Sequence, residues 1–262
     1  MKALTRRWRL IVLCAGIFGG ISSQAHARNL ADIVKARSIK VGILTDVPSL
    51  NQASGNKRIG FEVALMDKFA KSLKISVVWV KTDSKSIKND LTSNKIDLLL
   101  PQRELLSSPL PSGISNSAPY YCSGAVILTR DTAIKNSSGL LDKKIAIQPG
   151  KSYFDYLKRL SLEKNANVGR DVNTTILDLI YKNADVVIVD KLAALQAIGV
   201  YPKANLKMSH LLWATQFNAL VNSKDTTLVE AFNRFIKKIV DTGEYEQLSQ
   251  PYFAESVRCS GY

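Results

Sequence analysis

Two short segments of the chain combine residue types that could bind a small charged molecule. Residues 148–152 read Gln-Pro-Gly-Lys-Ser, between a short apolar run and a helical pattern. The backbone N–H groups and positive dipole at such a helix start attract an anion. Gly150 permits close approach, Lys151 adds a positive charge and Ser152 is a candidate cap. The competing interpretation is that these residues form an ordinary turn between a strand and a helix.

Asp190 offers the opposite charge. It ends the apolar run Val-Val-Ile-Val at 186–189, where a carboxylate has to be solvated, paired or offered to a cationic ligand. The alternative is that Asp190 caps a helix beginning at residue 191. Elsewhere, Arg103 could grip a carboxylate in bidentate fashion or simply pair with Glu104, and Asp46 is of a type common in turns.

The sequence has too few histidines and cysteines to form a metal site or a catalytic triad. The sequence has 2 His and 3 Cys, of which His26 and Cys14 lie in the first 27 residues. Since His210 is the only later histidine, we expect no zinc site, no Ser/His/Asp triad and no cofactor. The carboxylates of Asp46, Glu62 and Glu104 have no identifiable acid/base partner, so enzymatic activity is not expected.

The elements that must position these residues alternate between strand and helix. Strands are predicted at residues 39–44, 75–80, 96–100, 125–129, 144–148, 185–189 and 217–222. Helices are predicted at residues 61–73, 86–92, 153–160, 175–181 and 191–198, and from 228 onward. This order predicts an α/β fold with mostly parallel sheets, which bind ligands beyond the carboxyl ends of their strands. The loops at 45–49, 101–104 and 149–152, together with Asp190, are therefore the expected site.

The N-terminus has the pattern of a secretory signal peptide. Residues 2–9 are basic, residues 10–21 are apolar, and Ala-His-Ala at 25–27 supplies the small residues that signal peptidase requires. We predict cleavage after Ala27. A membrane-spanning helix is the alternative, but it needs about twenty apolar residues. The mature chain is therefore expected in a Gram-negative periplasm, where its two cysteines, Cys122 and Cys259, either form a disulfide or stay as buried thiols.

The chain is basic but shows no nucleic-acid signature. Its 262 residues are 46% hydrophobic and 22% charged, with 36 Lys+Arg against 22 Asp+Glu. Residues 1–27 hold four of the cations and no acid, so the remainder carries +10. These cations are scattered, with no aromatic interleaving, and we expect no nucleic-acid partner.

Six sequence motifs, in order, resemble those of the family 3 periplasmic solute-binding proteins, the polar amino-acid receptors of ABC importers. They are IKVG at 39–42, GFEVAL at 60–65, KIDLL at 95–99, SAPYY at 117–121, LLDKKIAIQPG at 140–150 and ADVVIVD at 184–190. The resemblance implies a two-lobe periplasmic-binding-protein fold of type II with two crossing hinge strands. It places the first lobe at residues 28–126 plus 217–262, and the second at 127–216.

The resemblance also implies ligand-binding residues. Asp190 falls where the family places the carboxylate that receives an α-amino group. Gly150, Lys151 and Ser152 fall where it places the loop that helps to hold an α-carboxylate. A monomer that delivers its ligand to an inner-membrane ABC permease is implied as well.

The first lobe departs from the family pattern. The family usually has Ser-x-Thr-x-x-Arg after the KID strand, whereas this chain has no arginine at the expected position near 109–110. Gln102 and Arg103, or Lys151 from the other lobe, are the candidates to replace that charge. Two usual aromatic positions are altered as well: the first turn reads Asp-Val-Pro-Ser at 46–49, and Ser84 stands at the second.

These observations favour a periplasmic receptor for a small polar, amine-bearing solute such as an amino acid or a derivative. The alternative is an accessory or sensor protein of the same fold with a degenerate ligand site. The altered first lobe keeps that alternative open.

Overall fold

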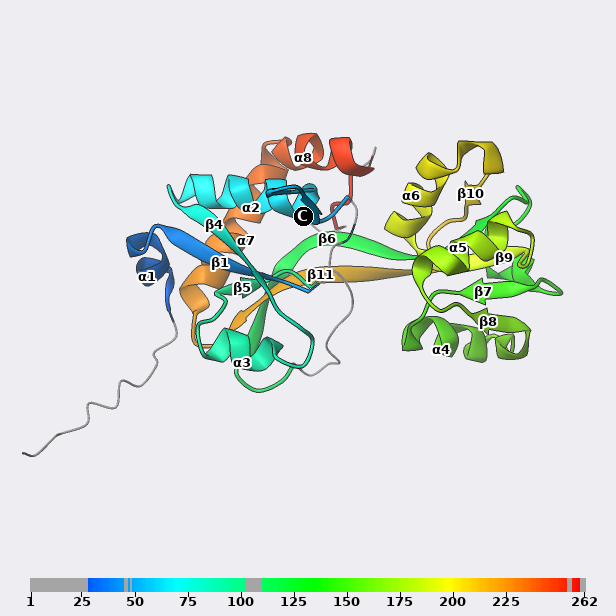
Figure 1. The fold of residues 1–262 in the computed structure, drawn as a ribbon, viewed down its shortest axis with the longest axis horizontal. Helices are drawn as coiled ribbons and strands as arrows, with labels where there is room; N and C mark the ends of the chain where they lie inside the picture. Colours follow the sequence, from blue (N-terminus) through cyan, green and yellow to red (C-terminus); the bar gives the residue numbers. More distant parts are fainter. Residues whose placement is uncertain (1–27, 45–46, 48, 102–109, 254–255, 260–262) are drawn as a thin grey trace, which may run out of the picture.

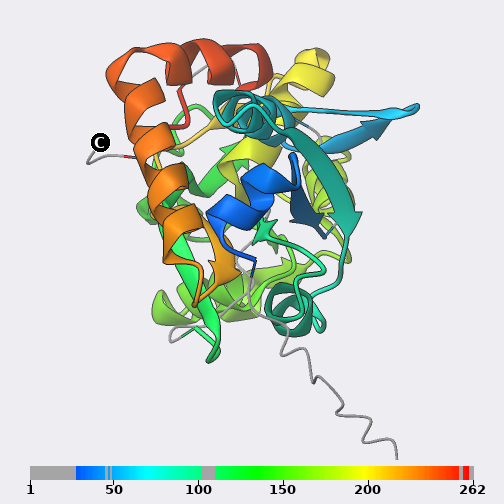
Figure 2. The same cartoon turned by 90° about the vertical axis from the view of Figure 1, so that its left-hand side faces the viewer.

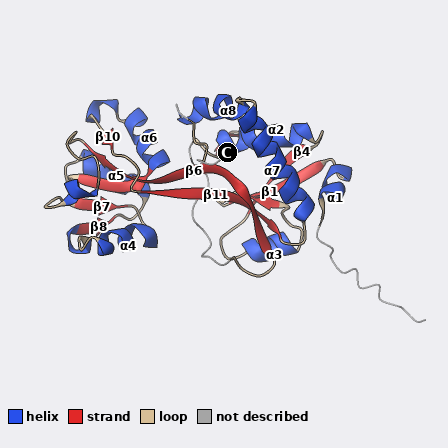
Figure 3. Cartoon of the chain, turned by 180° about the vertical axis from the view of Figure 1, so that it is seen from behind, coloured by secondary structure: helices blue, strands red, loops and turns tan. Residues whose placement is uncertain are grey.

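The computed structural model describes residues 28–44, 47, 49–101, 110–253 and 256–259. Its helices and strands form two lobes at opposite ends of two long strands, β6 (Ile114–Thr129) and β11 (Trp213–Asn222) (Figure 1). Both strands run without a break from one lobe into the other (Figure 3). Among the described residues, no helix combines the length and apolar character needed to cross a membrane.

The first lobe is built from both ends of the chain. It contains α1 (Leu30–Lys35), β1 (Ser38–Ile43), β2 (Gln52–Ser54), β3 (Lys57–Ile59), α2 (Phe61–Ser72), β4 (Ser76–Lys81), α3 (Ile87–Thr92), β5 (Leu98–Leu99), α7 (Thr226–Asp241) and α8 (Glu244–Phe253). Seen from this lobe's end, α7 runs along one side and the β2–β3 hairpin projects from the other (Figure 2).

The second lobe is formed by the middle of the chain. It contains the 3-10 turn η1 (Ser137–Leu140), β7 (Ile145–Ile147), α4 (Lys151–Arg159), η2 (Glu163–Asn165), β8 (Ala166–Val168), α5 (Val172–Ile180), β9 (Val186–Asp190), α6 (Lys191–Val200), η3 (Pro202–Ala204) and β10 (Lys207–Met208).

One mixed sheet runs through both lobes in the order β4-β1-β5-β11-β6-β9-β7-β8, with β10 added beside β6. The pairs β1–β4, β1–β5, β7–β8 and β7–β9 are parallel. The four other described pairs of this sheet all involve β6 or β11 and are antiparallel. The expectation of mostly parallel sheets is therefore correct only in part: β1, β4 and β5 are parallel in the first lobe, and β7, β8 and β9 in the second, whereas every described pairing of β6 and β11 is antiparallel. β6 and β11 pair with each other in antiparallel fashion because they cross between the lobes in opposite directions.

Each lobe has its own apolar core. In the first lobe, α2, α7 and α8 pack on the sheet around the fully buried rings of Phe61, Phe69 and Phe232. The buried face of α7 carries apolar residues at helical spacing, including Phe232, Phe235 and Ile239, as its sequence pattern predicts. In the second lobe, separate clusters cover the two faces of β9: Val187 and Val189 face α5 and α6, while Val186 and Ile188 face the opposite side.

Candidate functional site

The structure describes only some of the residues predicted to bind ligand. Asp46, Gln102 and Arg103 lie outside the described residues. Lys151 is the first residue of α4, and its side chain is likewise outside the description. Asp190, Gly150, Ser152 and Ser84 are described.

Asp190 lies at the carboxyl end of β9 and is half-buried. Its Oδ1 accepts a hydrogen bond from the backbone N–H of Leu192 at 2.8 Å, so Asp190 is the N-cap of α6. The hydroxyl of Ser123, on β6, lies 2.8 Å from both carboxylate oxygens. The capping interpretation is thus correct, and the carboxylate is held at the same time by the strand that joins the lobes.

The charge of Asp190 is the result of opposing effects. Burial raises the pKa of this carboxyl above its ordinary value. Hydrogen bonds from the backbone of Leu192, from the hydroxyl of Ser123 and from the backbone N–H groups of Gly124 and Ala193 oppose that shift. These donors are neutral, so they orient the carboxylate without adding a positive charge.

The loop before α4 lies beside Asp190. The side-chain oxygen of Gln148 accepts the backbone N–H of Asp190 at 2.9 Å, which joins the carboxyl ends of β7 and β9. Gly150 is the N-cap of α4 and has no side-chain capping bond, while Ser152 is the helix's second residue and therefore not its cap. Gly150 has φ +156°, and a Cβ there would lie 3.1 Å from the Tyr153 ring. The start of a nine-residue helix is thus placed next to a carboxylate.

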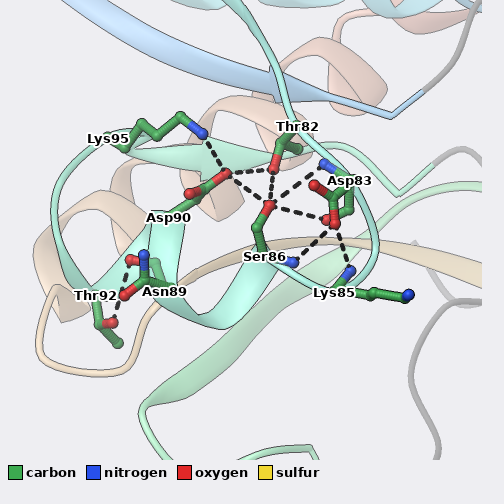
Figure 4. Close-up of polar contacts among 8 residues, drawn as sticks. All are labelled: Thr82, Asp83, Lys85, Ser86, Asn89, Asp90, Thr92 and Lys95. Carbon is green, nitrogen blue, oxygen red and sulfur yellow. Dashed lines mark hydrogen bonds and ion pairs between the residues drawn. The ribbon is translucent and has the colours of Figure 1, made fainter.

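In the first lobe, Ser84 lies exposed in the turn between β4 and α3. The turn is built around Asp90, which is 2% exposed. One oxygen of Asp90 accepts bonds from the hydroxyls of Thr82 and Ser86 (3.1 Å for Ser86) and from Lys95 Nζ at 3.0 Å (Figure 4). Asp83 adds bonds from the backbone N–H groups of residues 85 and 86. These contacts fix the backbone that presents Ser84, but none of them involves Ser84 itself.

The two cysteines form a disulfide. Cys122 and Cys259 are bridged, with their Cα atoms 5.0 Å apart, and the backbone N–H of Cys122 donates to the carbonyl of Val257 at 2.8 Å. The C-terminal segment is thereby attached to β6, one residue before Ser123. The interpretation as two buried thiols is wrong.

Two hollows of about 340 and 290 Å³ lie in the second lobe, far from Asp190. Ala184, just before the amino end of β9, lines both hollows, whereas Asp190 and Gln148 lie at the carboxyl ends of β9 and β7. No group of three or more potential metal ligands occurs within the described part of the chain.

Ser123 and Gln148 are the site residues that sequence reasoning missed. Gln148 lies in the motif at 140–150 and ends the strand predicted at 144–148, and this position at a strand end is the signal that could have identified it. Ser123 had none, because its contact with Asp190 spans 67 residues and depends on the register in which β6 pairs with β9.

Comparisons with known proteins agree with this architecture. The profile of the bacterial extracellular solute-binding proteins, family 3, matches residues 39–255. A probable histidine-binding protein of Campylobacter jejuni is 26% identical over 223 residues, covering 83% of this chain and 86% of its own. The L-cystine-binding protein TcyJ of Escherichia coli is 26% identical over 260 residues, covering 97% of each chain.

Among solved structures, the L-cystine solute receptor of Neisseria gonorrhoeae, in its unliganded open conformation, superposes with a TM-score of 0.75. It is 20% identical and covers 88% of this chain and 100% of its own. That likeness concerns the fold, which is the α/β fold of type II periplasmic binding proteins. Because the family profile spans most of the sequence, from β1 to beyond α8, the chain belongs to the bacterial extracellular solute-binding proteins of family 3.

Proposed function

We propose that the protein is a periplasmic receptor that binds a small polar, amine-bearing solute between its lobes and delivers it to an inner-membrane ABC permease. The observation that carries the proposal is the Asp190 carboxylate, which is oriented by a hydroxyl and backbone N–H groups at the carboxyl end of β9. Because these donors are neutral, they do not neutralise the charge of the ionised carboxylate, and an ammonium group would donate strong charge-assisted hydrogen bonds to it.

An acidic group on the same ligand would meet the start of α4. Gln148 connects that loop to Asp190, so the two ends of a zwitterion could be held a few ångströms apart. The Gly150 and Ser152 N–H groups and the charge of Lys151 would favour a carboxylate there. Gln102, Arg103, Asp46 and Ser84 are the proposed first-lobe contacts.

The proposed lobes comprise residues 28–126 with 217–262, and residues 127–216. This division is supported by the separate cores: the buried residues of the first-lobe clusters lie outside the 125–213 interval, and those of the second-lobe clusters lie inside it. A ligand touching both lobes would favour the closed conformation by the contacts that only this conformation provides. The receptor acts as a monomer, performs no chemical reaction on its ligand and reaches the periplasm after cleavage behind Ala27. The family of secreted receptors supports that location.

A thermal-shift screen tests the proposal. Refolded, ligand-free mature protein is screened with amino acids, including histidine and cystine, and with diamines, opines, small peptides and organic acids. A ligand at one hundred times its Kd adds about 2.7 kcal/mol to the free energy of unfolding. We expect a raised Tm for an amine-bearing class and its loss in Asp190→Asn, which keeps the shape of the side chain.

The matched control is Asp178→Asn, at the opposite end of the second lobe. It should keep the shift. A rise in Tm that persists in Asp190→Asn would contradict the role of the carboxylate. If no compound in the screen raises Tm, the alternative of a sensor or accessory protein is favoured. The altered first-lobe motif is the observation behind that alternative.

A further inference from the structure

We propose that Ser123 is a positioning residue of the amine-binding site, and that its hydroxyl fixes the orientation of the Asp190 carboxylate for an ammonium ligand. This inference rests on the proposed function and deepens it. Ser123 does not need to touch the ligand, because it acts through Asp190.

The geometry at Asp190 is set from two elements. The Ser123 hydroxyl oxygen is equidistant from the two carboxylate oxygens, at 2.8 Å from each. The backbone N–H of Leu192, on α6, reaches Oδ1 at 2.8 Å. A carboxylate bonded only at its helix cap, by the N–H groups of Leu192 and Ala193, could still rotate about its terminal torsion. The donors on β6 fix its plane: the Ser123 hydroxyl, together with the backbone N–H of Gly124.

Ser123 is itself firmly placed. Its side chain is buried, with 2% of the residue exposed. It pairs with Thr215 of β11 on one side of β6, and the preceding residue, Cys122, is covalently joined to Cys259. The donor therefore sits on a strand that is restrained by a neighbouring strand and by the C-terminal segment.

The hydroxyl also favours the charged form of Asp190. Burial raises the pKa of this carboxyl, and the bonds from Leu192 and Ser123 pull it down. Tyr121 on β6 is an ionisable group that interacts with Asp190: its own pKa is raised by burial and by the negative charges of Glu62 and Asp190. The pKa of Tyr120, also on β6, is raised by burial and by Glu62. Lys191 is the first residue of α6, and Asp178 on α5 lies toward the far end of β9. Loss of the Ser123 hydroxyl should thus raise the pH at which Asp190 takes up a proton.

The first measurement needs no ligand. The Asp190 carboxyl ¹³C resonance of mature, ligand-free protein is titrated with pH in wild type, Ser123→Ala, Ser123→Thr and Ser117→Ala. Ser117 is the matched control, because it is also a buried serine on β6 and its hydroxyl bonds to Ala118 and Ala219. We expect a raised midpoint in Ser123→Ala, and unchanged midpoints in Ser117→Ala and in Ser123→Thr, which keeps a hydroxyl.

The second measurement is affinity for the amine found in the thermal-shift screen. Ser123→Ala should raise Kd about tenfold, the equivalent of one hydrogen bond to a charged group. As the solution is acidified, Ser123→Ala should lose the amine at a higher pH than wild type does, because a protonated Asp190 no longer attracts an ammonium group. Circular dichroism establishes that each variant is folded.

The outcomes separate the two proposals. A midpoint and a Kd that do not change in Ser123→Ala overturn the positioning role, even if an amine binds to wild type. If the midpoint rises as expected while no amine binds to wild type, the proposed function fails and the hold of Ser123 on Asp190 is established.

Discussion

Two aspartates show how the same residue type serves different ends in this molecule. Asp90 is almost fully buried, and one of its oxygens accepts bonds from Thr82, Ser86 and Lys95. Asp190 is half-buried at a strand end and is held by neutral donors. We infer that Asp90 stabilises the β4–α3 turn, while Asp190 is available to a ligand.

Asp90→Asn is therefore expected to destabilise the fold. Burial disfavours the charge of Asp90, but the bonds from Thr82, Lys95 and Ser86 outweigh it and lower the pKa from 3.8. Loss of these charge-assisted bonds should cost about 1–3 kcal/mol in urea unfolding at pH 7. Because the folded-state pKa is depressed, this stabilisation is present above about pH 4 and is lost as pH falls through the lowered value.

Lys95→Met is the matched variant, since it removes only the ion pair. The Lys95 side chain is 52% exposed, so this change should cost less than about 1 kcal/mol. A loss as large as that of Asp90→Asn, or a difference between Asp90→Asn and wild type that persists in strong acid, would contradict the assignment.

At this scale the sequence predicted that the carboxyl ends of two strands come together, and the bond between Gln148 and Asp190 shows that they do. Asp190 and the loop at 149–152 could be found because each follows an unbroken apolar run, and strand ends in parallel sheets meet at one edge. The contact from Ser123 could not, because cross-strand neighbours follow from register and not from spacing along the chain.

Among the elements, the sequence predicted only part of β6, and it predicted none of the short strands β2, β3, β8 and β10. Only residues 125–129 were predicted, because they are uniformly apolar, whereas the strand extends over Ile114–Thr129. Its first part mixes buried and partly exposed residues without strict alternation and contains Pro119 and Gly124, which obscure a strand pattern. The six helices predicted from periodicity, α2 to α7, each begin within a few residues of the prediction, because amphipathic spacing over several turns is a stronger signal.

Gly124 explains how β6 and β11 pack so closely between the lobes. A Cβ at this position would lie 2.1 Å from the carbonyl oxygen of Trp213. Gly124→Ala should therefore push the two strands apart and lower the free energy of unfolding by about 2 kcal/mol, as overpacked sites do. Urea unfolding followed by far-UV circular dichroism measures the change.

The control is Gly199→Ala in α6, where an added Cβ meets nothing within 4 Å. An alanine inside a helix should leave stability unchanged or raise it by about 0.5–1 kcal/mol. If Gly124→Ala and Gly199→Ala change the free energy of unfolding equally, the close approach of β11 to Gly124 does not affect stability.

On the scale of the whole molecule, the sequence predicted two lobes from its resemblance to a family, and the structure shows them. Composition and periodicity alone supported only an α/β fold. Neither of these signals indicates that β6 and β11 run on from one lobe into the other, because such continuity depends on pairing between segments about a hundred residues apart.

The disulfide is the covalent link within this architecture. Replacing both Cys122 and Cys259 by serine should lower the free energy of unfolding by about 2–5 kcal/mol, because the bridge closes a long loop that is otherwise free in the unfolded chain. The bridge joins residues 137 positions apart. Guanidinium unfolding of the mature protein, with and without reductant, provides the measurement.

Reductant should bring wild type to the stability of the double variant and leave the double variant unchanged. An unfolding midpoint of wild type that is indifferent to reductant would contradict the stabilising role.

The same bridge encloses the entire second lobe in a covalent ring that begins at Cys122 and ends at Cys259. A protease that cuts once inside this ring adds one water molecule and leaves both fragments joined, so the nicked chain stays a single covalent species until a thiol is added. A force applied between the two ends of the mature chain would extend residues 28–121 and pass through the bridge, without pulling the second lobe apart.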